Sequence, residues 1–134
     1  MHRSGTSCLA GGLEQAGLYF GDVVHQSPHN KKGNKENKAL RLLNGDLLRF
    51  NQGSWDVIPP ELNWNAELSD RRDTLLTEYD SQSLWAFKDP RCLITLPFWR
   101  EALPDLRFVG TFRNPAAVVQ SRKLAEKCCP RPRP

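Results

Sequence analysis

Apolar residues recur at helical spacing in the N-terminal half of the chain. The pattern predicts helices over residues 6–16 and 36–50, and one or two further helices over 61–79. Gly17 is a plausible stop for the first of them. The polar segment 23–34 contains Pro28 and Gly33, so it is predicted to be a loop. The residues expected to face inward are Leu9, Leu13 and Ala16, then Leu40, Leu43, Leu47 and Leu48, then Leu62, Leu68, Leu75, Leu76 and Tyr79.

The pattern changes in the C-terminal half. Short apolar runs at 84–87 and 106–112 are typical of buried strands, and each stops at charged residues. A helix is predicted over 93–103, with Pro97 in its first turn. Another is predicted over 116–125, with Asn114 as N-cap and Pro115 as first helical residue. Strands that alternate with helices predict an α/β fold with a parallel sheet.

Composition narrows the class of protein. The 134 residues suffice for one modest domain, and a formal charge of +4 with pI near 9.0 suits an anionic ligand. The basic residues are dispersed, which excludes a nucleic-acid platform, and no apolar stretch is long enough for a membrane span. We expect no signal peptide and a cytoplasmic protein with reduced cysteines, Cys8 facing the core. The Pro/Arg-rich segment 126–134 is expected to be a disordered tail.

Basic residues stand where strands end. Lys88 and Arg91 follow the first predicted strand, Arg113 ends the second, and Arg3 precedes the first helix. Ligands of open α/β sheets bind at the carboxyl ends of the strands. Helix N-termini at Thr6 and Asn114 would add free N–H groups and positive dipole ends. The sequence therefore predicts a site for a multiply charged anion.

The details of this site disfavour a magnesium nucleoside triphosphate. The phosphate loop of nucleotide hydrolases has Lys directly after its last Gly, but here Thr6 follows Gly5. Magnesium would need a strand that ends in Asp, and the second predicted strand ends in Arg113. Consequently no metal site is expected. A nucleotide whose charge is met by Arg and Lys alone fits better.

These residues resemble motifs of the PAPS-dependent sulfotransferases, in their bacterial-type branch. The segment 3–7, with sequence RSGTS, is similar to the family's 5′-phosphosulfate loop. Arg113-Asn114-Pro115, followed by Ser121, is similar to its 3′-phosphate motif. Segments 87–91, 97–99 and 30–48 also resemble that branch. The resemblance covers about residues 1–125, which would form a partial sulfotransferase domain, and it excludes the tail 126–134.

The resemblance implies a fold and a set of roles. The fold would be the three-layer sandwich with a parallel sheet of P-loop nucleotide hydrolases, here with its first strand missing. The chain is therefore expected to be a truncated, inactive member of the family. The cofactor-binding residues for PAPS would be Arg3, Ser4, Gly5, Thr6, Ser7, Arg113 and Ser121. Arg3 and Lys88 would stabilise the leaving oxygen as catalytic residues. Glu36 is the first candidate for the general base, and the alternatives are that neither Glu36 nor Asp89 is the base, or that Asp89 is.

The sequence leaves the acceptor, the oligomeric state and two alternative functions open. The acceptor would be a hydroxyl of a small molecule or a glycan, and the oligomeric state is undetermined. Alternatives are a P-loop nucleotide kinase or hydrolase and a non-catalytic nucleotide-binding fragment. Residues with a weaker claim to a ligand contact are His2, His25, His29, Trp55 and Trp64.

Overall fold

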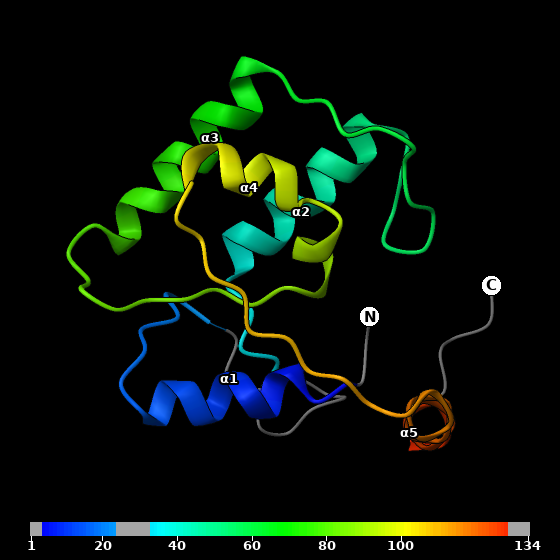
Figure 1. The fold of residues 1–134 in the computed structure, drawn as a ribbon. Coiled ribbons are helices and arrows are strands. Elements are labelled where there is room, and N and C mark those ends of the chain that lie inside the picture. Colours follow the sequence, from blue (N-terminus) through cyan, green and yellow to red (C-terminus); the bar gives the residue numbers. More distant parts are fainter. Residues whose placement is uncertain (1–3, 24–32, 129–134) are drawn as a thin grey trace.

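The computed structural model describes residues 4–23 and 33–128, which fold as helices joined by long connections (Figure 1). In chain order these elements are α1 (Thr6–Gln15), α2 (Lys38–Phe50), α3 (Ala66–Leu76), the 3₁₀ helix η1 (Thr77–Tyr79), the 3₁₀ helix η2 (Pro90–Leu93), α4 (Leu96–Ala102) and α5 (Pro115–Cys128). The helices predicted from apolar periodicity are therefore confirmed, but the helix predicted from residue 61 begins at Ala66 and the helix predicted from residue 93 begins at Leu96.

The predicted fold class is wrong. Within residues 4–23 and 33–128 there is no β-strand, so a parallel-sheet sandwich of the P-loop type is not supported. Two isolated bridges take its place, a parallel one between Tyr19 and Trp85 and an antiparallel one between Val23 and Asn37. In the parallel bridge, the N–H of Tyr19 donates to the carbonyl of Leu84 at 3.2 Å, and the N–H of Ala86 donates to the carbonyl of Tyr19 at 2.8 Å.

The segment 106–112 shows why the strand prediction failed. Phe108, Val109 and Phe112 are 59%, 68% and 91% exposed, so this apolar run is not buried. A strand takes its hydrogen bonds and its buried face from neighbouring segments, and an apolar run alone supplies neither. No described segment pairs with these residues, and the chain passes from α4 to α5 without regular structure (Figure 1).

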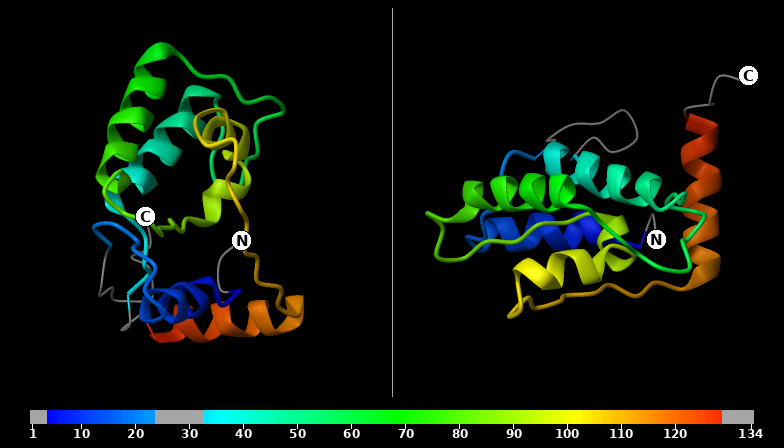
Figure 2. Two further views of the ribbon diagram at one scale, coloured as in Figure 1. Left: turned by 60° about the vertical axis from the view of Figure 1, so that its left-hand side comes forward. Right: turned by 90° about the horizontal axis from the view of Figure 1, so that it is seen from above.

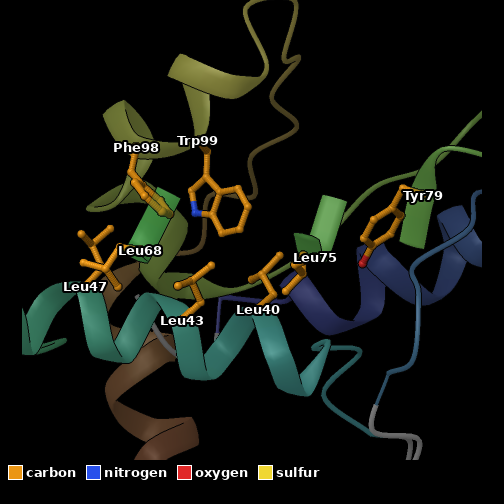
Figure 3. Close-up of a cluster of buried hydrophobic side chains, with 8 residues drawn as sticks. All are labelled: Leu40, Leu43, Leu47, Leu68, Leu75, Tyr79, Phe98 and Trp99. Carbon is orange, nitrogen blue, oxygen red and sulfur yellow. The ribbon is translucent and has the colours of Figure 1, made fainter. Parts of the chain in front are cut away.

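The main core lies between α2, α3 and α4. Leu40, Leu43 and Leu47 point from α2 toward Phe98 and Trp99 of α4 (Figure 3). The other buried members are Leu68, Leu75 and Tyr79 from α3 and η1. Full burial of a Leu or Phe side chain contributes about 1.5–3 kcal/mol, so this cluster is the main source of stability in the described chain.

α1 belongs to a second, smaller cluster. Its Ala10 is buried with Phe20 and Val23, and Leu13 packs against them. The expected inward position of Cys8 is wrong, because Cys8 is exposed. Residues 8 and 10 are separated by about 200° around a helix with 3.6 residues per turn, so they face opposite sides. α1 lies below the group of α2, α3 and α4 in Figure 1, and α5 lies beyond its N-terminal end in Figure 1 and in the right view of Figure 2.

Asparagine side chains begin three of the helices. Asn37 Oδ1 accepts from the N–H of Ala39 at 2.9 Å and caps α2, and Asn65 Oδ1 caps α3. Asn114 Oδ1 accepts from the N–H of Ala116 at 2.9 Å, which confirms its predicted role ahead of Pro115. α5 runs to Cys128, past the predicted helix end at residue 125, and residues 129–134 of the predicted tail lie outside the described residues.

Gly21 sits where a side chain has no room. It has φ of +74°, and an added Cβ would lie 2.5 Å from Tyr79 Oη and 2.9 Å from Asn37 Nδ2. Gly21→Ala should therefore lower the free energy of unfolding by about 2–4 kcal/mol, from left-handed strain plus overpacking. Gly17→Ala is the matched control, because Gly17 has φ of +98° and nothing within 4 Å of its Cβ position. Equal losses in urea denaturation for the two variants would contradict the steric argument.

Candidate functional site

The N-terminus of α1 has no side-chain cap. Gly5 stands at the N-cap position with φ of 93° and ψ of 4°, and no side chain accepts from the first turn. The first N–H groups of an α-helix have no partner inside the helix, so those of Thr6 and Ser7 are available to an acceptor. A Cβ at Gly5 would meet no described atom within 4 Å. Such a helix end favours an anion.

Lys88 brings a cation to this end of α1. Its Nζ donates to Glu36 Oε1 at 2.7 Å, to the carbonyl of Asn34 at 3.0 Å and to Ser7 Oγ at 3.4 Å. The side chains of Lys88 and Glu36 are each only 12% exposed. Ser7 Oγ in turn donates to the carbonyl of Asn34 at 3.3 Å. One ammonium group thus joins α1, the segment before α2 and the segment before η2.

A second ion pair holds the same segments together. Lys35 Nζ lies 2.5 Å from Glu14 Oε2 near the other end of α1. With the Lys88–Glu36 pair, it fixes residues 34–36 against α1 at two points. Partly buried ion pairs of this kind orient side chains more than they stabilise the fold, because desolvation offsets most of the attraction.

Three of the predicted site residues therefore meet. Ser7, Glu36 and Lys88 form one hydrogen-bonded group, although Ser7 and Lys88 are 81 positions apart. Ser4, Gly5 and Thr6 complete the turn that begins α1, and Ser4 is buried. The remaining predicted residue of this loop, Arg3, lies outside the described residues, as do His2, His25 and His29.

The predicted 3′-phosphate residues lie on another element. Arg113 is exposed directly before α5, and Ser121 is half-buried within that helix. Neither is among the hydrogen-bond partners of Lys88 or Glu36. In Figure 1 and in the right view of Figure 2, α5 lies beyond the N-terminal end of α1, where Gly5 is the N-cap residue.

Asp89 has a structural environment. Its Oδ1 accepts from the N–H of Arg91 at 3.0 Å and caps η2. Its Oδ2 accepts from Asn44 Nδ2 at 3.1 Å and forms an ion pair with Arg91 Nη1 at 3.2 Å. The carboxylate side chain has no exposed surface. Both oxygens are thus engaged by the fold, whereas the side-chain partner of Glu36 is Lys88.

Asn44 is the residue that the sequence analysis left without a role. It is fully buried, and its Oδ1 accepts from Thr95 Oγ1 and from Trp99 Nε1, both at 2.9 Å. Its Nδ2 donates to Asp89 Oδ2 and, at 3.4 Å, to Cys92 Sγ. Asn44 therefore connects α2 to η2 and α4. A signal was present, because an asparagine within the leucine stripe of α2 must be buried and therefore needs partners.

We expect the protein to lose stability at alkaline pH, because two buried side chains have raised pKa values. Burial raises the pKa of Tyr79 to about 12, and burial, followed by the nearby Asp89 charge, raises the pKa of Cys92 to about 12. The folded state therefore keeps protons that the unfolded chain releases near pH 9–10, so stability should fall from there up to pH 12.

The loss should be on the order of 2–3 kcal/mol for Tyr79, and urea midpoints measured against pH would show it. Tyr79→Phe should flatten the upper part of that decline and Cys92→Ala the lower part. A pH profile identical to that of the original protein in both variants would contradict these assignments.

Comparisons with known proteins assign no family. No protein-family model matches the chain, and no curated protein or solved structure matches it either. Among residues 4–23 and 33–128, no helix is long and apolar enough to cross a membrane. The same residues include no group of three or more His, Cys, Asp or Glu side chains arranged to hold a metal ion.

Proposed function

We propose that this chain is a PAPS-dependent sulfotransferase that transfers a sulfuryl group to a hydroxyl of a small molecule or a glycan. The observation that carries the proposal is the meeting of Ser7, Glu36 and Lys88 at the uncapped end of α1. The sequence motifs assign these three residues to one reaction, and they come from distant parts of the chain. A shared location is what that assignment requires.

The residues present fit a phosphosulfate in shape. Gly5 lets the backbone approach an oxyanion closely, and no side chain caps the N–H groups of the first turn. The positive charge needed to bind a phosphosulfate would come from Lys88, but the ammonium of Lys88 is neutralised by Glu36 in this structure. Binding would therefore draw Lys88 from Glu36 toward the ligand.

Such an exchange would give each group a catalytic task. Lys88 would donate to the oxygen that leaves with the nucleotide, which stabilises its developing charge. Glu36, released from the ion pair, would accept the proton of the acceptor hydroxyl. PAPS supplies the sulfuryl group: its bond to the 5′-phosphate oxygen breaks as the bond to the acceptor oxygen forms. Asp89 is not assigned this task, because the fold already engages both of its oxygens.

Thermal shift with the product nucleotide PAP tests the binding step. A ligand at 100 times its Kd should add about 2.7 kcal/mol to the free energy of unfolding. Arg113→Ala should abolish the shift given by PAP if that residue binds the 3′-phosphate. Arg107→Ala, an exposed arginine on the same connection, is the control and should leave the shift unchanged.

The same assay separates the rival functions. A shift with magnesium ATP but none with PAP would replace the proposal by a nucleotide kinase or hydrolase. A shift with PAP but no transfer from PAPS to any hydroxyl acceptor would reduce the chain to a nucleotide-binding protein. A folded protein that responds to none of these nucleotides would overturn the proposal.

A further inference from the structure

A second basic site lies on the outer side of α2. An open groove of about 300 Å³ runs between α2, the connection that follows it and η2. That connection, residues 51–60, leaves the C-terminal end of α2 and loops back toward the side of η2 (Figure 1). The lining residues are Arg41, Leu42, Gly45, Leu48, Arg49, Gly53, Ser54, Trp55 and Arg91. Three of them are arginines, and none is acidic.

The arginines retain donors for a ligand. Arg91 Nη1 donates to the carbonyl of Arg41 and to Asp89 Oδ2. The guanidinium has five N–H donors, so three of them remain for a ligand. The guanidinium of Arg41 is on an exposed residue and has no hydrogen-bond partner in the described part of the chain. Arg49 pairs with Asp46, which also binds Arg71.

Two of the three arginines have carboxylate partners, Arg91 with Asp89 and Arg49 with Asp46, so Arg41 supplies the charge at this wall that no described carboxylate offsets. The Asp89 side chain has no exposed surface, and Asp46 is shared between Arg49 and Arg71. Asp56 is exposed and accepts from Ser54 Oγ at 2.6 Å. Planar guanidinium groups with unused donors bind carboxylate and sulfate oxygens in pairs, so the groove favours a ligand that carries such groups.

The form of the groove narrows the ligand further. Its volume is at the small end of the range for small-molecule sites, larger than one inorganic anion needs. Trp55 lines the groove and is 47% exposed. A sugar ring has one apolar face, which matches an indole ring.

We propose that this groove binds an anionic saccharide, with its sulfate or carboxylate groups on Arg41 and Arg91 and a ring against Trp55. This site is distinct from the end of α1 and does not depend on nucleotide binding there. Ser7, Glu36 and Lys88 are not among the residues that line the groove.

Calorimetric titration of the full chain tests this inference. The probe is a sulfated, uronate-containing disaccharide, compared with the uncharged disaccharide of the same linkage and with inorganic sulfate. The sulfated probe should bind at least tenfold more tightly than either. Arg41→Gln should weaken it at least tenfold, and Trp55→Ala should weaken it as well. Arg100→Gln, an exposed arginine on α4, should change its Kd less than twofold.

Several outcomes would overturn the inference. Equal weakening by Arg100→Gln would show attraction by net charge alone, and equal binding of the uncharged disaccharide would exclude recognition by the arginines. Inorganic sulfate as tight as the disaccharide would exclude a saccharide ligand. Binding to phosphatidylserine vesicles, with none to the sulfated probe, would assign the face to a membrane surface. Circular dichroism of each variant verifies that these exposed substitutions leave the fold intact.

Discussion

Asn44→Ala should lower the free energy of unfolding by about 3–5 kcal/mol, a large part of the 5–15 kcal/mol typical of a domain. The substitution leaves Trp99 Nε1 and Thr95 Oγ1 without their buried acceptor and removes a donor from the buried Asp89 carboxylate. A buried polar group that loses its partner costs about 1–3 kcal/mol, and a charged one costs more. Urea denaturation followed by circular dichroism measures the loss.

Asn63→Ala is the matched control for this variant. Asn63 is exposed, and only its backbone takes part in the hydrogen bonds with Asn51, so its replacement should change stability by less than about 0.5 kcal/mol. A loss below about 1 kcal/mol for Asn44→Ala would show that the network has partners other than Asn44, and would contradict its central position.

Lys88→Met should lower the rate of sulfuryl transfer from PAPS by about 100–1000-fold, if the proposed function is right. Methionine keeps the unbranched stem of lysine but removes the ammonium that contacts Glu36, Asn34 and Ser7. The rate should be measured at saturating PAPS, because the loss concerns charge stabilisation in the transition state more than binding. Lys88→Arg, which keeps the charge, should recover part of the activity.

The variant also leaves the Glu36 carboxylate without its cation at 12% exposure. Lys88→Met combined with Glu36→Gln removes both charges and should recover the stability that the single variant loses, without recovering activity. Lys38→Met, on an exposed lysine at the start of α2, should leave both rate and stability unchanged. Full activity in Lys88→Met would contradict the assignment of Lys88 to the reaction.

Sequence reasoning succeeded where the signal is local. The leucine spacing of 40, 43 and 47 places these side chains on one helix face whatever surrounds it, and the structure buries all three. Caps are equally local, since an asparagine before Pro115 needs only the next few N–H groups to begin a helix. The motif residues Ser7, Glu36 and Lys88 were also named from the sequence, but their contacts could not be derived from it.

It failed where structure depends on distant partners. The runs 84–87 and 106–112 have the composition of strands, yet pairing decides whether a strand forms, and composition does not name the partner. The sequence did not predict the basic groove, for a related reason. Arg41, Arg49 and Arg91 look like dispersed surface charges in the sequence, and only the packing of η2 beside α2 brings them to one wall.

By itself, the sequence determined the approximate positions of the helices, the Asn114 cap and the leucine face of α2 that enters the core. Each of these depends on side chains within a few positions of one another, so the periodicity of the chain suffices. Tertiary structure alone decided that no sheet forms in the described residues, that Asn44 joins three elements, and that Lys88 meets Glu36 and Ser7 at the end of α1. These outcomes depend on contacts across as many as 81 positions, and such contacts form only when the whole chain packs.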